Sequence, residues 1–135
     1  MEVLIMNEQV KNLLQNSIWD VATCADNRPN VVPVGFKEVL DDGRLAFANV
    51  FLETTMKNIQ ANGGRVAISV YDAKTFEGYQ IQGTAEYITE GKPVDDFKAM
   101  ADSLFHGAVT AKGAVLVTPE KVIVTTPGAD NKKVL

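Results

Sequence analysis

Apolar and polar residues alternate most regularly between positions 78 and 88. Tyr79, Ile81, Ala85 and Tyr87 occupy one set of alternate positions, and polar residues occupy most of the other set. Successive side chains of a β-strand point to opposite faces, so this pattern predicts a strand with one buried and one solvated face. Shorter apolar runs bounded by turn residues predict further strands at 18–25, 31–40, 45–49, 65–71, 114–117 and 122–126.

Three other segments carry apolar residues at the spacing of an amphipathic helix. The first covers residues 7–16 and begins at Asn7, a preferred N-cap residue. The second begins near Thr54 and ends at the two glycines after Asn62, because glycine readily adopts the left-handed conformation that ends helices. The third begins at Pro93. Its predicted apolar stripe consists of Val94, Phe97, Ala101 and Leu104.

Turns rather than helices separate most of the predicted strands. Residues 26–30 and 41–44 are rich in Asp, Asn, Pro and Gly, and residues 118–121 predict a turn between the last two strands. A parallel sheet would need a long crossover between most strands, and such crossovers are missing. We therefore expect one α+β domain over residues 1–135. The expected architecture is mainly antiparallel β, a split β-barrel of about six to seven strands with two to three accessory helices.

Composition narrows the functional classes. The chain has 135 residues, a formal net charge of −4, one cysteine and one histidine. An acidic chain without a basic stripe is not expected to bind nucleic acid. So few Cys and His residues argue against a metal site. The sequence has no apolar run of membrane-spanning length and no signal-peptide pattern at its start, so we expect a cytoplasmic protein that does not associate with a membrane.

Few side chains suggest direct catalysis. Ser103 and His106 are three residues apart, but a hydrolase also needs an orienting group and an oxyanion hole, and the sequence indicates neither. We expect His106 at a helix C-terminus. Cys24 lies among apolar residues of a predicted strand, so a buried, unreactive thiol is expected. Trp19 is expected to pack in the core or at an interface, and stacking on a cofactor ring is the alternative. No catalytic acid or base is assigned.

The start of the second predicted helix has the features of a phosphate site. Thr54, Thr55 and Lys57 place two hydroxyl groups and a positive charge in its first turn. The first N–H groups of a helix lack internal partners, and the helix dipole makes this end partly positive. The combination favours an anion such as phosphate. An ordinary N-cap followed by a surface lysine is the alternative.

The predicted strand at 31–40 contains both Pro33 and Gly35. Proline cannot donate to a strand ladder and glycine weakens one, so this segment suits a sheet edge or a close approach of the backbone to a flat ligand. The glycine-rich motifs of dinucleotide-binding and P-loop proteins are absent from the sequence, which argues against those two classes.

The order of these segments resembles the pyridoxamine-phosphate-oxidase-like FMN-binding split barrels, especially their small single-domain FMN-binding proteins. The resemblance runs from about Trp19 to the C-terminus, and the matching segments are residues 30–36, 42–45, 54–59, 65–68 and 79–85. It implies FMN as the cofactor. The phosphate is then expected to contact Thr54, Thr55, Lys57 and Asn58. The flavin ring is expected to lie along Pro33, Val34 and Gly35 and near Ala48, Asn49 and Val50.

The resemblance also implies a homodimer with the flavin at its interface, in which the segment 131–135, ending at Leu135, reaches the partner's flavin. Many relatives carry Arg or Lys where this chain has Thr54 or Thr55, so its phosphate site carries less charge. The extended C-terminal region with which true pyridoxamine-phosphate oxidases bind their substrate is absent, and that activity is not expected. The implied function is electron transfer with a redox partner protein, or a small oxidoreductase.

Two alternatives remain open from the sequence. A deazaflavin-dependent reductase is similar in fold, but its cofactor has a long acidic tail, and this acidic chain offers few basic residues to bind it. A flavin-binding or flavin-storage protein without turnover is expected to carry the same site.

Overall fold

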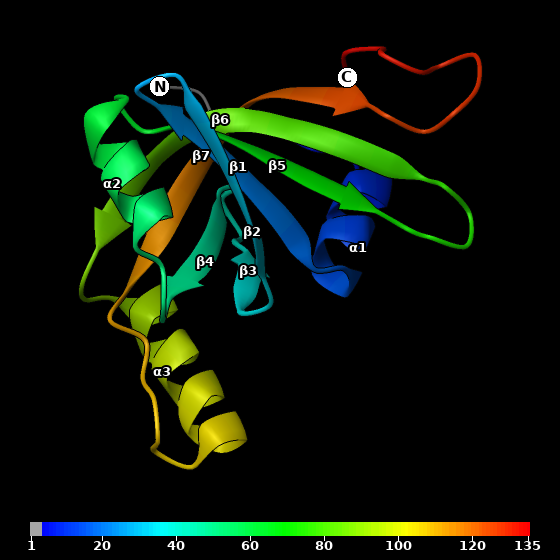
Figure 1. The fold of residues 1–135 in the computed structure, drawn as a ribbon. Coiled ribbons are helices and arrows are strands. Elements are labelled where there is room, and N and C mark those ends of the chain that lie inside the picture. Colours follow the sequence, from blue (N-terminus) through cyan, green and yellow to red (C-terminus); the bar gives the residue numbers. More distant parts are fainter. Residues whose placement is uncertain (1–3) are drawn as a thin grey trace.

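One curled antiparallel sheet forms the centre of the protein. The structure, a computed structural model, describes residues 4–135, and three helices flank the sheet (Figure 1). The seven strands lie in the order β2-β1-β5-β6-β7-β4-β3. The predicted α+β split-barrel fold is therefore confirmed. The elements are α1 (Glu8–Asn16), β1 (Trp19–Ala25), β2 (Arg28–Val34), β3 (Lys37–Val39), β4 (Leu45–Asn49), α2 (Thr54–Ala61), β5 (Arg65–Tyr71), β6 (Gly78–Ile88), α3 (Lys92–Phe105) and β7 (Gly113–Val124).

The helices cover different parts of the sheet. Both α1 and α2 bury their apolar residues in the larger core cluster, inside the curl of the sheet. A smaller cluster joins α3 to residues of β4 and β7. The predicted start of α1 is confirmed, since the Asn7 side chain accepts a hydrogen bond of 2.9 Å from the Val10 backbone N–H.

Trp19 connects α1 to the sheet. Its side chain is fully buried, and its indole Nε1–H donates a hydrogen bond of 2.8 Å to the Leu14 carbonyl oxygen near the end of α1. The expected core role of Trp19 is confirmed. An indole in this position fills core volume and satisfies a carbonyl group of the last helical turn at the same time.

The strand predicted at 31–40 is interrupted, which is the most consequential difference from the sequence prediction. β2 ends at Val34 and pairs with β1, whereas β3 begins at Lys37 and pairs with β4. Gly35 and Phe36 lie between them, outside either strand. Because β2 and β3 are the two outermost strands in the sheet order, the chain crosses from one edge of the sheet to the other at this break. This crossing forms the split in the barrel.

The turn predicted at 118–121 is wrong, because β7 continues through this segment and pairs with β6 along its length. The register shifts there: Gly83 pairs with Pro119 and Gln82 pairs with Lys121, so one residue of β7 is left over as a β-bulge. A bulge accommodates the missing N–H of Pro119. A Cβ atom on Gly83 would lie 2.5 Å from the Thr118 carbonyl oxygen, so the close strand contact requires glycine.

The apolar stripe predicted for α3 is confirmed only in part. Val94, Phe97 and Ala101 are buried, but the Leu104 side chain is 61% exposed. The C-terminal turns of α3 extend past the edge of the sheet (Figure 1), so nothing in the described part of the chain covers that face of the helix. No helix in the described residues has both the length and the apolar character needed to cross a membrane.

Replacing Trp19 with alanine should lower the free energy of unfolding by about 3–5 kcal/mol, because it removes a large buried side chain and leaves a cavity. Urea unfolding monitored by far-ultraviolet circular dichroism measures this loss. Ile5→Ala is the matched control, since Ile5 is largely exposed and its truncation should cost less than about 0.5 kcal/mol. Equal losses for the two variants would contradict the assigned role of Trp19.

Candidate functional site

A pocket lies where the break between β2 and β3 meets the end of β4 and the last turn of α3. Its volume is about 300 Å³, and we call it the ring pocket. It brings together five of the six residues expected near a flavin ring, from two segments of the sequence. The lining residues are Pro33, Val34, Gly35, Phe36, Ala48, Val50, Phe51, Leu52, Leu104 and Phe105.

The strand break leaves backbone groups available in this pocket. The Ala48 N–H donates a hydrogen bond of 3.0 Å to the Phe36 carbonyl oxygen, which holds the break against β4. Neither Gly35 nor Phe36 donates its own N–H to another described residue. A Cβ atom on Gly35 would meet no atom within 4 Å, so the space above its backbone is open. The polar edge of a flat ligand can therefore approach the main chain here.

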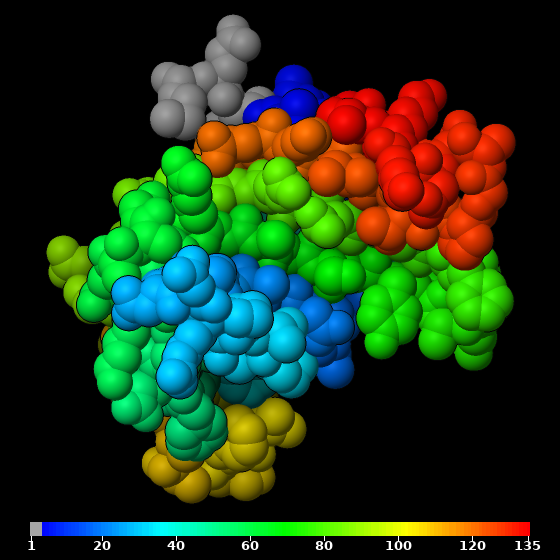
Figure 2. Space-filling model, turned by 45° about the horizontal axis from the view of Figure 1, so that its top comes forward, coloured from blue at the N-terminus to red at the C-terminus, as the bar shows by residue number. Residues whose placement is uncertain are grey.

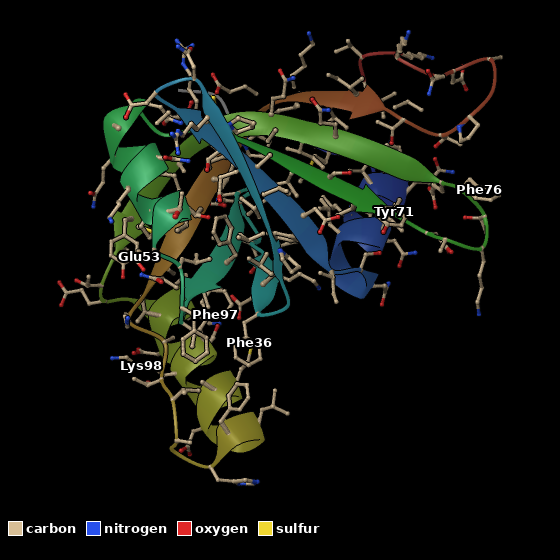
Figure 3. The ribbon with its side chains drawn as sticks, in the orientation of Figure 1. Phe36, Glu53, Tyr71, Phe76, Phe97 and Lys98 are labelled. Atoms are coloured by element: carbon tan, nitrogen blue, oxygen red, sulfur yellow. The ribbon has the colours of Figure 1, made fainter. Side chains whose placement is uncertain are left out.

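The side chains of the ring pocket are uncharged, and most are apolar. The rings of Phe36 and Phe105 pack edge to face, with centroids 6.0 Å apart. Phe51 is 76% exposed at the mouth of the pocket. In Figure 3, Phe36 lies between the sheet and α3. A concave apolar site with a few backbone donors is the usual environment for a flat ring ligand.

Charged groups cluster at the opposite end of α3. Lys92 pairs with Asp96 at 2.7 Å, and this hydrogen bond lowers the pKa of Asp96. Burial and a hydrogen bond with Asp96 raise the pKa of Glu38 on β3. Asp96 precedes Leu104 by eight residues, or about 12 Å of helix. These charged groups do not line the ring pocket.

Two of the expected phosphate contacts point toward the sheet. Thr55 is 1% exposed, and its hydroxyl oxygen accepts a hydrogen bond of 3.1 Å from the Asn30 side chain. The Asn58 amide is also buried and donates a hydrogen bond of 3.0 Å to the Thr23 hydroxyl. These two side-chain pairs attach α2 to β1 and β2. Sequence position alone does not show whether Thr55 and Asn58 hold α2 on the sheet or bind phosphate.

Thr54 and Lys57 are the two expected phosphate contacts that face solvent. The Lys57 ammonium group is 74% exposed and lies 3.4 Å from the Glu53 carboxylate. Glu53 precedes the helix but makes no side-chain cap hydrogen bond. An anion at the start of α2 can therefore meet first-turn backbone N–H groups, the Thr54 hydroxyl and Lys57, in competition with Glu53.

Asn49 shapes the turn that leads from β4 to α2. Its side chain donates to the Tyr87 hydroxyl at 3.2 Å and accepts from the Leu52 N–H at 3.1 Å. It is buried and does not line the ring pocket, although its neighbours Ala48 and Val50 do.

Leu135 lies away from the ring pocket of its own chain. Its N–H donates a hydrogen bond of 2.9 Å to the Val122 carbonyl oxygen, and Val134 forms a bridge with Ile123. The tail therefore folds back on the C-terminal end of β7, whereas Ala48 pairs with Ala114 at the other end of that strand.

The prediction of a buried Cys24 is wrong, because the side chain is exposed on the outward face of β1. Five lining residues of the ring pocket were also not identified from the sequence. These are Phe36, Phe51, Leu52, Leu104 and Phe105. The apolar Phe-Leu pair at 51–52, in a loop before a helix, was an available signal. Leu104 and Phe105 carry no such sequence signal, because only the packing of α3 places them at the ring pocket.

Comparison with known proteins agrees with this geometry. Residues 6–127 match the family described as pyridoxamine 5'-phosphate oxidase. The chain belongs to this family. It is 31% identical over 136 residues to the uncharacterized protein MJ0282 of Methanocaldococcus jannaschii, covering 98% of this chain and 89% of that protein.

Solved structures of other proteins share the fold. HupZ of Group A Streptococcus has a TM-score of 0.79 and 26% identity, covering 93% of this chain and 98% of that one. An FMN-binding protein of Syntrophomonas wolfei has a TM-score of 0.78 and 16% identity, covering 90% and 87%. An F420 reductase has a TM-score of 0.65 and 23% identity, covering 87% and 98%. The last two are similar to this chain in fold alone.

Thr55→Val should lower the free energy of unfolding by about 1 kcal/mol, because the half-buried Asn30 amide loses its acceptor while the side-chain volume is preserved. Thr54→Val is the matched control at an exposed position and should cost less than about 0.5 kcal/mol. Urea unfolding of both variants measures the difference. If Thr54→Val lowered the free energy of unfolding as much as Thr55→Val does, Thr55 would not hold α2 on the sheet.

Proposed function

We propose that this protein binds FMN, with the isoalloxazine ring in the ring pocket and the phosphate at the start of α2, and that it acts in electron transfer or as a small oxidoreductase. The observation that carries the proposal is the ring pocket, which joins the strand break at Gly35 to the end of β4. Leu52 lines this pocket and Thr54 begins α2 two residues later, so the ring and phosphate sites adjoin.

The residues present fit the parts of FMN. Apolar side chains face the flat ring, and the free N–H groups of Gly35 and Phe36 suit its polar edge. Thr54, Lys57 and the first-turn N–H groups of α2 suit the phosphate. Bound FMN supplies the redox chemistry. The chain orients the ring and excludes water from one side of it. None of the lining side chains can donate a proton, so protons for any reduced product come from solvent.

The proposed active form is a homodimer. Exposed Phe51 and Leu104 at the mouth of the ring pocket leave an apolar surface that a single chain does not cover. A second copy related by two-fold symmetry would supply two equivalent covers. The C-terminal segment ending at Leu135 remains a candidate contributor from the partner, since it is exposed on the surface of its own chain.

FMN is favoured over a deazaflavin because no basic residue lines the ring pocket and the chain is acidic overall. Cofactor released by denaturing the purified, flavin-loaded protein should therefore run as FMN on chromatography. FAD, haem or a deazaflavin in its place, or no bound chromophore after flavin is added, would overturn the proposed cofactor.

Photoreduction followed by electron transfer to an acceptor protein then separates a redox function from storage.

Lys57→Ala should weaken FMN binding about tenfold or more, because a hydrogen bond to an ionised group contributes ~1.5–3 kcal/mol. Riboflavin has no phosphate, so its affinity should change much less. Quenching of flavin fluorescence on titration measures both constants. Lys98→Ala is the matched control, an exposed lysine on α3 (Figure 3), and should leave both affinities unchanged. Equal losses of FMN and riboflavin affinity would show that Lys57 does not contact the phosphate.

A further inference from the structure

The chain between β4 and α2 carries parts of both halves of the candidate site. Val50, Phe51 and Leu52 line the ring pocket, and Thr54 begins α2 two residues after Leu52. Residues 50–53, which we call the site loop, belong to no helix or strand. In Figure 2 this loop lies at the surface beside α3. A segment outside the regular elements opens easily unless other contacts hold it in one conformation.

The Asn49 side chain supplies a contact that holds the site loop. Its amide oxygen accepts a hydrogen bond of 3.1 Å from the Leu52 N–H, and its amide nitrogen donates one of 3.2 Å to the Tyr87 hydroxyl. The Leu52 N–H can only donate, so the amide oxygen must face it and the amide nitrogen must face Tyr87. The Tyr87 hydroxyl thus holds the Asn49 amide in the orientation that the Leu52 N–H requires.

These hydrogen bonds are sheltered from solvent. Asn49 is 7% exposed, and Tyr87 is half-buried and packs, like Leu52, against the larger core cluster. A buried polar group that loses its partner keeps the full cost of its desolvation, because water does not replace the partner. Removing the Tyr87 hydroxyl is therefore expected to disturb the Asn49 amide rather than to leave it in place.

The start of β7 is built around the same hydroxyl. A Cβ atom on Gly113 would overlap the Tyr87 hydroxyl oxygen, so glycine at this position leaves space for the tyrosine. The Lys112 N–H donates a hydrogen bond of 2.8 Å to the Asn49 carbonyl oxygen. The last turn of α3 lines the ring pocket and ends at Phe105, a short segment before this point. The tyrosine and the asparagine therefore join the site loop to the strand that follows α3.

We infer that the Tyr87 hydroxyl is a positioning group for the flavin site: through Asn49 it holds the site loop, and it thereby fixes the spacing between the ring pocket and the start of α2. The inference deepens the proposed function, on which its flavin-related part rests. FMN carries its ring and its phosphate in one molecule, so the two sites must be held at a matching spacing. A loop that is ordered before the cofactor arrives avoids the entropic cost of ordering it on binding.

The role of Tyr87 in this arrangement is indirect. Neither Asn49 nor Tyr87 lines the ring pocket. A change at Tyr87 therefore reaches the flavin through the site loop. Because the loop forms part of the pocket wall, the change should weaken riboflavin binding as well as FMN binding. This pattern differs from the one expected for Lys57→Ala, which should affect FMN much more than riboflavin.

Amide hydrogen exchange, measured by NMR on the cofactor-free protein, tests the hold on the site loop. Tyr87→Phe removes only the hydroxyl and should raise the exchange rate of the Leu52 amide about fivefold, the factor that one net hydrogen bond supplies. Tyr79→Phe is the matched control, because Tyr79 lies at the opposite end of β6 and its hydroxyl donates a hydrogen bond of 2.7 Å to Glu77. The control should leave the Leu52 amide unchanged. Unchanged exchange in Tyr87→Phe, or equal increases in both variants, would overturn the inference.

Flavin titration tests the consequence for binding. Tyr87→Phe should raise the dissociation constants of FMN and riboflavin about fivefold, whereas Tyr79→Phe should change neither. Asn49→Leu removes both hydrogen bonds of the amide. Adding Tyr87→Phe to Asn49→Leu should weaken binding no further, because Tyr87 acts through Asn49. Unchanged affinities in Tyr87→Phe, or fully additive losses in the double variant, would overturn the positioning role.

The two measurements separate this inference from the proposed function. If the protein binds no flavin while the Leu52 amide loses protection only in Tyr87→Phe, the proposed function is wrong and the hold on the site loop stands. If FMN binds to the wild-type protein and Tyr87→Phe weakens the binding of neither flavin, the proposed function stands and the positioning role is wrong.

Discussion

The rest of the structure depends on the break at Gly35 and Phe36, where the chain passes from one edge of the sheet to the other. Its physical origin is local, because Gly35 weakens a strand ladder; Pro33 lies before the break, within β2 at the edge of the sheet. Its consequence is global, because β2 can then pair with β1 while β3 pairs with β4. The same break exposes main-chain donors beside an apolar pocket, so the feature that splits the barrel also forms the candidate site.

The start of α2 shows how one set of residues can serve structure and binding. Thr55 and Asn58 point inward and hydrogen-bond to Asn30 and Thr23, which holds the helix at a fixed position on the sheet. Buried polar pairs of this kind are costly when broken, so they fix orientation well. The rest of the helix start, with Thr54 and its unpaired N–H groups, is thereby presented to solvent in a defined place.

Two parts of the surface carry fewer charged side chains than a solvated surface usually does. The ring pocket exposes apolar side chains at its mouth, and the outward sheet face is nearly uncharged. The homodimer proposed above would cover the apolar mouth of the ring pocket, which a single chain leaves open to solvent.

The sequence by itself determined the regular elements whose patterns are local. The strands at 65–71 and 78–88 and the N-cap of α1 agree with the prediction, because alternation and capping depend on near neighbours. It also indicated five of the ring-pocket residues, through the resemblance to a known fold. Tertiary structure alone decided the continuity of β7 across Pro119, the exposure of Leu104 and Cys24, and the inward direction of Thr55. Each of these depends on a partner segment distant in sequence, and a local pattern carries no information about which segment that will be.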